Sequence, residues 1–129
     1  MSQVPEDLRY TKEDEWLRVD GDELVLGVTD YAQDSLSDIV YLELPDAGDS
    51  FDAGDAFGVI ESVKAAADLF MPIAGEITAA NEDLMDTPEL VNEDPYGEAW
   101  LVRFKPTNMA DINDLMDADT YEVHLAERD

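Results

Sequence analysis

The chain has 129 residues, of which 33 are acidic and seven are lysine or arginine, so its formal net charge is −26. This charge argues against nucleic acid and anionic membranes as partners, because phosphate binding requires clustered lysine and arginine. The absence of cysteine excludes disulfides, thiolate metal sites and a cysteine nucleophile.

The N-terminal part of the chain predicts a β-hairpin. Residues 8–19 begin extended and contain Trp16. The Asp-Gly-Asp sequence of residues 20–22 is a turn signal, and residues 24–28 form the returning strand.

A short helix and a strand are expected next. Asp30, followed three residues later by Gln33, indicates a helix cap and a helix that ends near residue 37. Apolar and polar residues then alternate over residues 39–44, which predicts a half-buried strand. Three of its side chains are expected to face the core: Val40, Leu42 and Leu44.

A six-residue repeat covers residues 46–51 and 52–57. Its four aspartates at three-residue spacing suggest a calcium loop, but Ile60 stands where an EF-hand has its bidentate glutamate. We therefore interpret the repeat as two glycine-containing turns, each of which brings a phenylalanine to the core.

Residues 57–72 are the most informative stretch. Two apolar runs separated by a short polar step predict a β-hairpin with Lys64 near its tip. Pro72 cannot donate to a ladder, so the second strand ends there or lies at a sheet edge. Lys64 is one of only three lysines in the chain. The ordinary interpretation is a solvated turn lysine, and the alternative is a lysine that is modified.

The next segments are predicted to be mostly irregular. Residues 75–80 suggest a further strand or turn. Thr87 followed by Pro88 predicts one helical turn that Thr87 caps. Residues 92–97 are interpreted as a loop.

The C-terminal part predicts a strand and then a helix. Residues 100–105 alternate, and residues 108–128 are expected to be helical with a break near Asp117. His124 is the only histidine, so we assign it no metal or catalytic role. Three side chains of the strand are expected to face inward: Trp100, Val102 and Phe104.

Taken together, these segments resemble the glycine cleavage H-protein family, a branch of the biotinyl/lipoyl carriers. The resemblance spans about residues 8–125. Biotin carriers typically place methionine on both sides of the modified lysine, so Val63 and Ala65 favour lipoate. Asp14 departs from the family pattern, in which many members have histidine. The segments that carry the resemblance are residues 10–16, 27–33, 40–45, 61–68 and 91–97.

The resemblance implies a mainly β fold, the barrel-sandwich hybrid of two β-sheets with a C-terminal helix and short helical turns. It implies that Lys64 carries (R)-lipoate in amide linkage and swings as an arm. Glu15 and Asp68 occupy positions that resemble the acidic lining of the cleft where the arm docks. The alternative for both is an ordinary surface carboxylate in a very acidic protein.

The resemblance also implies partners and no turnover by the chain itself. Glycine decarboxylase (P protein) would load an aminomethyl group onto the arm, and aminomethyltransferase (T protein) would pass the one-carbon unit on. Dihydrolipoamide dehydrogenase (L protein) would reoxidise the arm, and a lipoate-attaching enzyme would install it. A monomer is expected. Two alternatives are an H-like protein that donates lipoyl groups to other enzymes and a lipoyl domain of a 2-oxoacid dehydrogenase complex.

Length and composition indicate the number of domains, the location and the source of the protein. We expect one domain over residues 1–129, because 45% hydrophobic residues support a single core. The sequence has no secretory h-region and no apolar run of about 18 residues, so a cytoplasmic protein is expected. Acids spread over the whole chain indicate a halophilic source, and an acidic surface for basic partners is the alternative.

Overall fold

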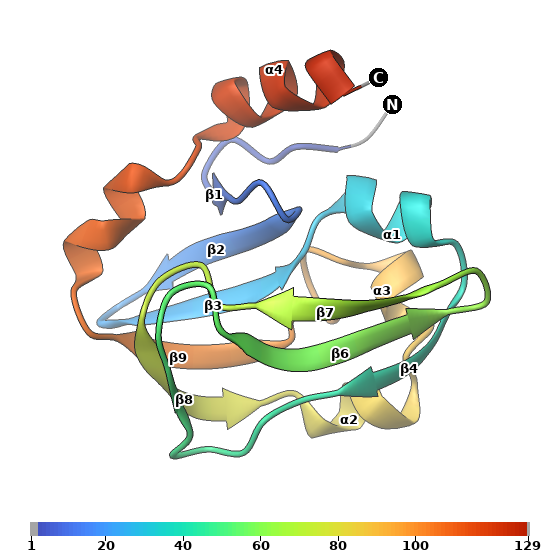
Figure 1. Ribbon diagram of the computed structural model, residues 1–129, viewed down its shortest axis with the longest axis horizontal. Helices are drawn as coiled ribbons and strands as arrows, with labels where there is room; N and C mark the ends of the chain where they lie inside the picture. The colour runs from blue at the N-terminus through green and yellow to red at the C-terminus, as the bar shows by residue number, and fades with distance from the viewer. Residues whose placement is uncertain (1–2, 129) are drawn as a thin grey trace.

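The computed structural model describes residues 3–128, so residues 1, 2 and 129 of the expected domain lie outside the described part. The described chain is mainly β, with two antiparallel sheets and a C-terminal helix (Figure 1). One sheet has the strand order β1-β2-β3-β9-β8-β5 and the other has the order β4-β6-β7. The predicted fold class is confirmed, and the strands described here do not close into a barrel.

The elements are short. The strands are β1 (Arg9–Tyr10), β2 (Glu15–Asp20), β3 (Glu23–Val28), β4 (Ile39–Glu43), β5 (Ser50–Phe51), β6 (Ala56–Ser62), β7 (Ala66–Phe70), β8 (Gly75–Ala80) and β9 (Val102–Pro106). The helices are α1 (Asp30–Leu36), α2 (Glu82–Asp86), α3 (Leu90–Glu93), the 3-10 helix η1 (Met109–Asp114) and α4 (Ala118–Arg128).

Both predicted hairpins form. β2 and β3 pair through a two-residue turn in which Gly21 has a φ of 66°, a value that glycine adopts without strain. β6 and β7 pair on either side of residues 63–65, with β7 at the edge of the three-stranded sheet. The second strand ends at Phe70, just before Pro72, as expected.

The cap of α1 is Thr29, so the prediction that Asp30 caps this helix was wrong. Thr29 has extended backbone angles, and its Oγ1 accepts a hydrogen bond from the Ala32 amide at 3.2 Å. Asp30 is already helical, and its carboxylate accepts instead from Gln33 Nε2 at 2.7 Å. The helix ends at Leu36, close to the predicted end.

A register shift in β4 overturns the predicted inward face of this strand. The pairing with β6 is irregular between Ile39 and Tyr41, so strict alternation is lost there. Ile39 and Leu42 are buried, whereas Val40 is exposed. Leu44 lies just beyond the strand and is only partly buried.

The segment after β8 is more helical than predicted. Helix α2 was not expected, and Thr87 is its C-terminal cap residue, not the cap of a following turn. The Thr87 hydroxyl donates to the carbonyl oxygen of Asp83 at 3.1 Å. Residues 92 and 93, predicted as loop, belong to α3.

The last strand and helix also differ in detail from the prediction. Leu101 precedes β9 and is fully buried, although alternation placed it outward, and Trp100 is only partly buried. Val102 and Phe104 face the core as expected. The predicted helical segment divides into η1 and α4, with the break over residues 115–117.

The repeat forms the two predicted glycine turns. Gly48 and Gly54 have φ values of 98° and 88°, and their amides donate at 2.8 Å to the carbonyl oxygens of Ile77, in β8, and Met71, just after β7. Phe57 is buried and Phe51 packs at the edge of the core. Within residues 3–128 no group of three acidic or histidine side chains is arranged to hold a metal ion.

Two apolar clusters hold the elements together. The larger lies between the sheets, and the smaller lies between β1, β2 and α4, where the Tyr10 and Tyr121 rings stack with centroids 4.6 Å apart. Figure 1 shows α4 lying over the strands at the N-terminal end of the chain. None of the helices in the described range is long and apolar enough to cross a membrane. The larger cluster includes Leu17, Leu24, Leu26, Leu42, Ile60, Leu69, Ile77 and Phe104.

Candidate functional site

Lys64 lies on a tight turn that the side chain of Ser62 organises. Ser62 Oγ accepts hydrogen bonds from the amides of Lys64 and Ala65, both at 3.1 Å. The Ser62 amide donates to the Ala65 carbonyl oxygen at 2.8 Å and closes the hairpin. A serine that bonds the backbone two and three residues ahead is a recognised turn signal, and Ser62 is the sequence feature that could have predicted this turn. Lys64 is therefore held by its backbone while its side chain remains exposed.

The amine of Lys64 points along the side of α1. Its Nζ lies 3.5 Å from the carbonyl oxygen of Ser35, near the C-terminal end of that helix. Residues 65–67, which are all alanine, are also exposed, so small side chains surround the lysine on the β7 side. This arrangement leaves the amine open to a second macromolecule.

A pocket of about 190 Å³ begins at the same helix end. Ser35 lines it, and so do both predicted docking carboxylates, Glu15 and Asp68. Lys64 itself does not line this pocket, but its amine contacts Ser35 at the pocket wall. The apolar part of the lining is Val28, Ala32, Leu36, Ile60, Ala67 and Leu69.

Glu15 is a buried carboxyl group, with only 2% of the residue exposed. Its Oε2 accepts a hydrogen bond from the Phe70 amide at 3.0 Å, and Thr11 Oγ1 lies 3.4 Å from Oε1. Burial raises the pKa of Glu15 to about 8, against the lowering effect of the Phe70 amide. The interpretation of Glu15 as an ordinary surface carboxylate is therefore wrong.

Asp68 is exposed and lies on β7, opposite Val59. Because it lines the same pocket as Glu15, the fold brings together two acids that are 53 residues apart in sequence. Glu15 is buried and Asp68 is exposed, so the two carboxyl groups that line the pocket differ in their access to solvent.

No pattern in the sequence indicates a cation at this pocket. Arg128, at the end of α4, lines the pocket and donates to Asp14 Oδ1 at 2.6 Å. Its guanidinium carbon lies 4.7 Å from the centroid of the Tyr31 ring. Tyr121 also donates to Asp14 Oδ1, at 2.9 Å. In the sequence, only Asp14, which stands where many family members have histidine, pointed to this region. It did not indicate that Arg128 would be its partner.

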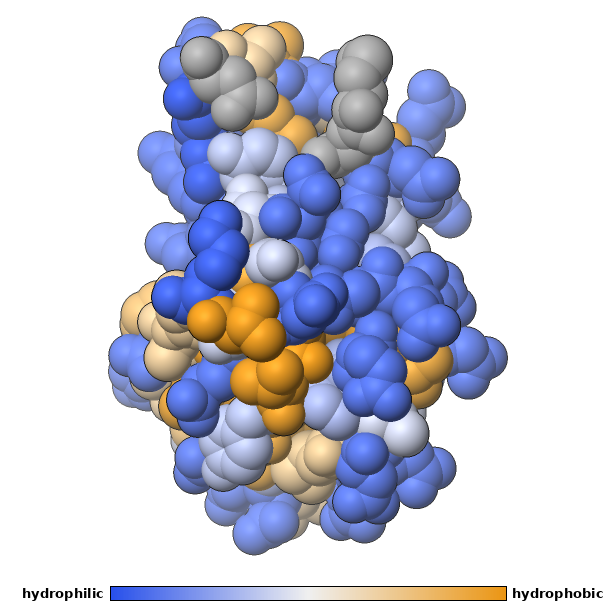
Figure 2. Space-filling model, turned by 90° about the vertical axis from the view of Figure 1, so that its right-hand side faces the viewer, coloured by the Kyte–Doolittle hydropathy of each residue, from blue (hydrophilic) through white to orange (hydrophobic). Residues whose placement is uncertain are grey.

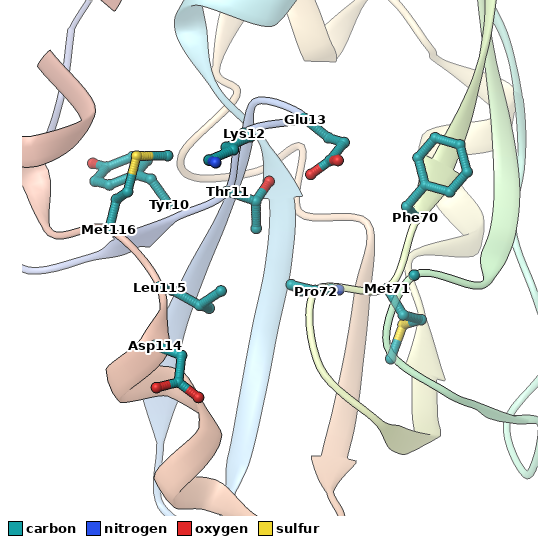
Figure 3. A pocket seen from close by; sticks show the side chains of 11 residues that line it. Tyr10, Thr11, Lys12, Glu13, Phe70, Met71, Pro72, Asp114, Leu115 and Met116 are labelled. Carbon is teal, nitrogen blue, oxygen red and sulfur yellow. The ribbon is translucent and has the colours of Figure 1, made fainter. Parts of the chain in front are cut away.

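A larger hollow of about 440 Å³ contains none of the predicted site residues. Figure 3 shows Tyr10 and Met116 on one side of it and Phe70 and Met71 on the other. It shares only Glu13 with the smaller pocket. The predicted site residues Glu15 and Asp68 therefore line the smaller pocket beside Lys64 and not the larger hollow.

The fold and this site define a carrier protein: an exposed lysine on a rigid hairpin, next to a small pocket lined by acids. An acylated lysine would be neutral, so its chain could lie against the apolar lining without the cost of burying an ammonium group. The comparisons with known proteins point to a particular family of carriers.

The family model described as glycine cleavage H-protein matches residues 8–128. A glycine cleavage system H protein of Carboxydothermus hydrogenoformans is 50% identical over 127 residues, covering 98% of each chain. One from Bacteroides thetaiotaomicron is 52% identical over 119 residues, covering 92% of this chain and 94% of the relative. The crystal structure of a glycine cleavage system H protein from Mycobacterium marinum matches with a TM-score of 0.88 and 32% identity, covering 95% of this chain and 99% of that one.

The chain belongs to the glycine cleavage H-protein family, as the sequence resemblance predicted. The family is a carrier component, and the chain has the lipoyl-carrier role in the glycine cleavage system.

Proposed function

We propose that Lys64 is the lipoylated residue and that Glu15 and Asp68 line the cleft in which the loaded arm docks. One observation carries this proposal: the Lys64 amine lies 3.5 Å from Ser35, which lines the pocket that also contains both acids. An arm attached at Nζ therefore starts at the edge of that pocket.

The residues present fit an acylated lysine. The Ser62 turn fixes the backbone, the exposed alanines 65–67 leave space, and the apolar lining accepts a hydrocarbon chain. When bound, the lipoyl group supplies a disulfide that accepts the one-carbon unit released from glycine and later yields it to a folate.

The chain's own groups then position and shield the cargo. Asp68 provides a solvent-facing carboxylate that attracts an amine into the pocket. Glu15 is the deeper group, fixed by the Phe70 amide, and it accepts or gives a proton near pH 8. The apolar lining excludes water from whatever lies between them.

The proposal includes partners and setting. Glycine decarboxylase, aminomethyltransferase, dihydrolipoamide dehydrogenase and a lipoate-attaching enzyme act on the same arm, and the chain itself catalyses no reaction. Tethering replaces successive bimolecular encounters by transfers at high effective concentration. Composition supports one domain over residues 1–129, a cytoplasmic location and a high-salt host, and these remain predictions, as does the expected monomer.

Intact mass and peptide mapping of protein purified from its native host test the proposal. The lipoyl mass increment is expected on the peptide that contains Lys64. Lys64→Arg should fold normally and carry no lipoate, because a guanidinium does not accept the acyl group here. Lipoate on Lys12 or Lys105, or on the Lys64→Arg protein, would contradict the assignment.

A further inference from the structure

Exposed apolar side chains gather at the Lys64 end of the three-stranded sheet. Six large apolar side chains are exposed among residues 3–128, and three of them lie here. The three are Val40, 54% exposed, Tyr41, 46% exposed, and Val63, 65% exposed. We call them the apolar collar.

The backbone brings the collar residues together. Ile39 pairs with Ser62 across β4 and β6. The amide of Val63 donates to the carbonyl oxygen of Asp38 at 3.0 Å, which ties the lysine turn to the start of β4. The register shift in β4 leaves both Val40 and the next residue exposed. Figure 2 looks onto the side of the molecule that carries this turn, and a hydrophobic group stands out there among hydrophilic side chains.

The collar contrasts with the rest of the surface. A chain with 33 acids covers most of its exterior with charge, yet it leaves apolar side chains next to its modified lysine. Apolar patches with a charged rim mark protein interaction sites, and tyrosine is enriched among the residues that dominate binding energy. The exposed acids nearest in sequence to the collar are Asp38 and Glu43, and the half-buried Glu61 pairs with Tyr41.

We propose that the apolar collar is the docking surface for the enzyme that attaches the lipoyl group to Lys64. The proposal rests on Lys64 being the lipoylated residue. An enzyme that acylates this amine must bring its active site to Nζ, so its rim must contact the residue before Lys64 and the strand bonded to it. Enzymes that act on the distal sulfurs meet the arm at its far end, away from the collar.

The chemistry of the step requires this close approach. The lysine nitrogen attacks the carbonyl carbon of an activated acyl donor, either a mixed anhydride or a thioester. The new C–N bond forms as the bond to the leaving group breaks, the leaving group takes the electron pair, and the nitrogen gives up a proton. A complementary enzyme surface has an apolar recess for Tyr41 and Val63, surrounded by lysine and arginine that face the acidic rim.

Lipoylation kinetics test the proposal directly. Apo-protein variants Val40→Thr, Tyr41→Ser and Val63→Thr are each incubated with purified lipoate–protein ligase, ATP and lipoate, and attachment is followed by intact mass. Val19→Thr and Val123→Thr are matched controls, because these valines are 52% and 58% exposed elsewhere. We expect kcat/KM to fall roughly tenfold for Tyr41→Ser, mainly through KM, with smaller losses for the valine variants and none for the controls.

Two further measurements separate the alternatives. Affinity of the ligase for the non-reacting Lys64→Ala protein should fall when Tyr41→Ser is added. Reoxidation of the reduced arm by dihydrolipoamide dehydrogenase should not change, because this enzyme acts at the distal sulfurs. The collar proposal is overturned if the collar variants are lipoylated as fast as the controls, or if lipoylation and reoxidation slow by the same factor. Neither result would contradict lipoylation of Lys64. Failure of the unsubstituted protein to gain lipoate at Lys64 overturns the proposed function as well.

Discussion

Arg128, at the end of the last helix, donates a 2.6 Å hydrogen bond to Asp14, on the turn that leads into β2. Asp14 has a φ of 68°, a left-handed conformation uncommon for residues with a side chain. The ion pair, the Tyr121 hydroxyl and the Tyr31 ring together fix this turn against α1 and α4. The C-terminal helix thus contributes its last residue, Arg128, to the wall of the pocket next to Lys64.

The Arg128→Ala substitution should destabilise the last turn of α4, which borders the pocket. Loss of a partly exposed ion pair and its contact with the Tyr31 ring should lower the free energy of unfolding by about 1–2 kcal/mol. Amide hydrogen exchange should speed up in the last turn of α4. Arg103→Ala is the matched control, since Arg103 also pairs with carboxylates, Asp20 and Glu23, but far from α4. Equal exchange changes in α4 for both variants would reject this role of Arg128.

Glu15 should make stability depend on pH in a definite direction. Its pKa is about 8 in the folded chain, above the ordinary value of 4.5, because it is buried. The folded chain therefore holds a proton that the unfolded chain has released, so stability is lost as pH rises from about 4.5 to 8. The slope approaches about 1.4 kcal/mol per pH unit for one proton.

Urea unfolding of the unsubstituted protein and of Glu15→Gln, at half-unit steps from pH 5 to 9, measures this effect. Glutamine keeps an acceptor for the Phe70 amide but cannot ionise. The variant should gain stability relative to the parent as pH rises. A difference that stays constant over this range would show that Glu15 ionises at an ordinary pKa.

At pH 9, above the pKa of Glu15, replacing both pocket acids by their amides should leave attachment intact but expose the cargo. Glu15→Gln with Asp68→Asn should be lipoylated normally, since neither residue contacts the Lys64 turn through a hydrogen bond in the described chain. The carried one-carbon unit should be lost to water roughly tenfold faster or more, because a charged hydrogen bond is removed. Glu76→Gln with Asp83→Asn changes the charge equally outside the pocket and is the control. Equal loss rates for the two double variants would reject the docking role.

Stability should rise strongly with salt. Among residues 3–128 only Arg103 and Arg128 form ion pairs with carboxylates, which leaves most acids to repel one another. The Debye length falls from about 10 Å at 0.1 M to about 3 Å at 1 M, so salt should screen this repulsion. Between 0.1 and 2 M potassium chloride the melting temperature should rise by at least about 5 °C, equivalent to about 1 kcal/mol. A non-ionic osmolyte should give a smaller rise, and a melting temperature that ignores salt would contradict the argument.

Local patterns predicted the two hairpins well, because turn residues and alternating apolar runs act over a few positions. They failed where a neighbouring segment decided the outcome. Val40 is exposed because β4 shifts register against β6, and Leu101 is buried because the chain packs into the core before β9 begins. Periodicity within one strand carries no information about either event.

In the candidate site, too, local patterns indicated the lysine, whereas contacts between distant segments could not be predicted. Lys64 could be proposed as the modified residue from its own hairpin and from the resemblance to lipoyl carriers. The burial of Glu15 depends on the Phe70 amide, which is 55 residues away, and the Asp14–Arg128 pair joins residues 114 positions apart. Contacts of this range depend on how the two sheets and α4 pack, which no short motif encodes.

The Ser62 turn sets a limit on how the carrier can work. The amides of Lys64 and Ala65 both donate to Ser62 Oγ, and the Ser62 amide donates to the Ala65 carbonyl oxygen, so three hydrogen bonds fix the backbone of the hairpin tip. With Lys64 as the proposed lipoylated residue, the arm would rotate about this turn, and its reach would be the length of the lysine and lipoyl chain alone. Each enzyme that shares this carrier must present its reaction centre within the reach of the same arm, so the partners are expected to use the arm in turn and not at the same time.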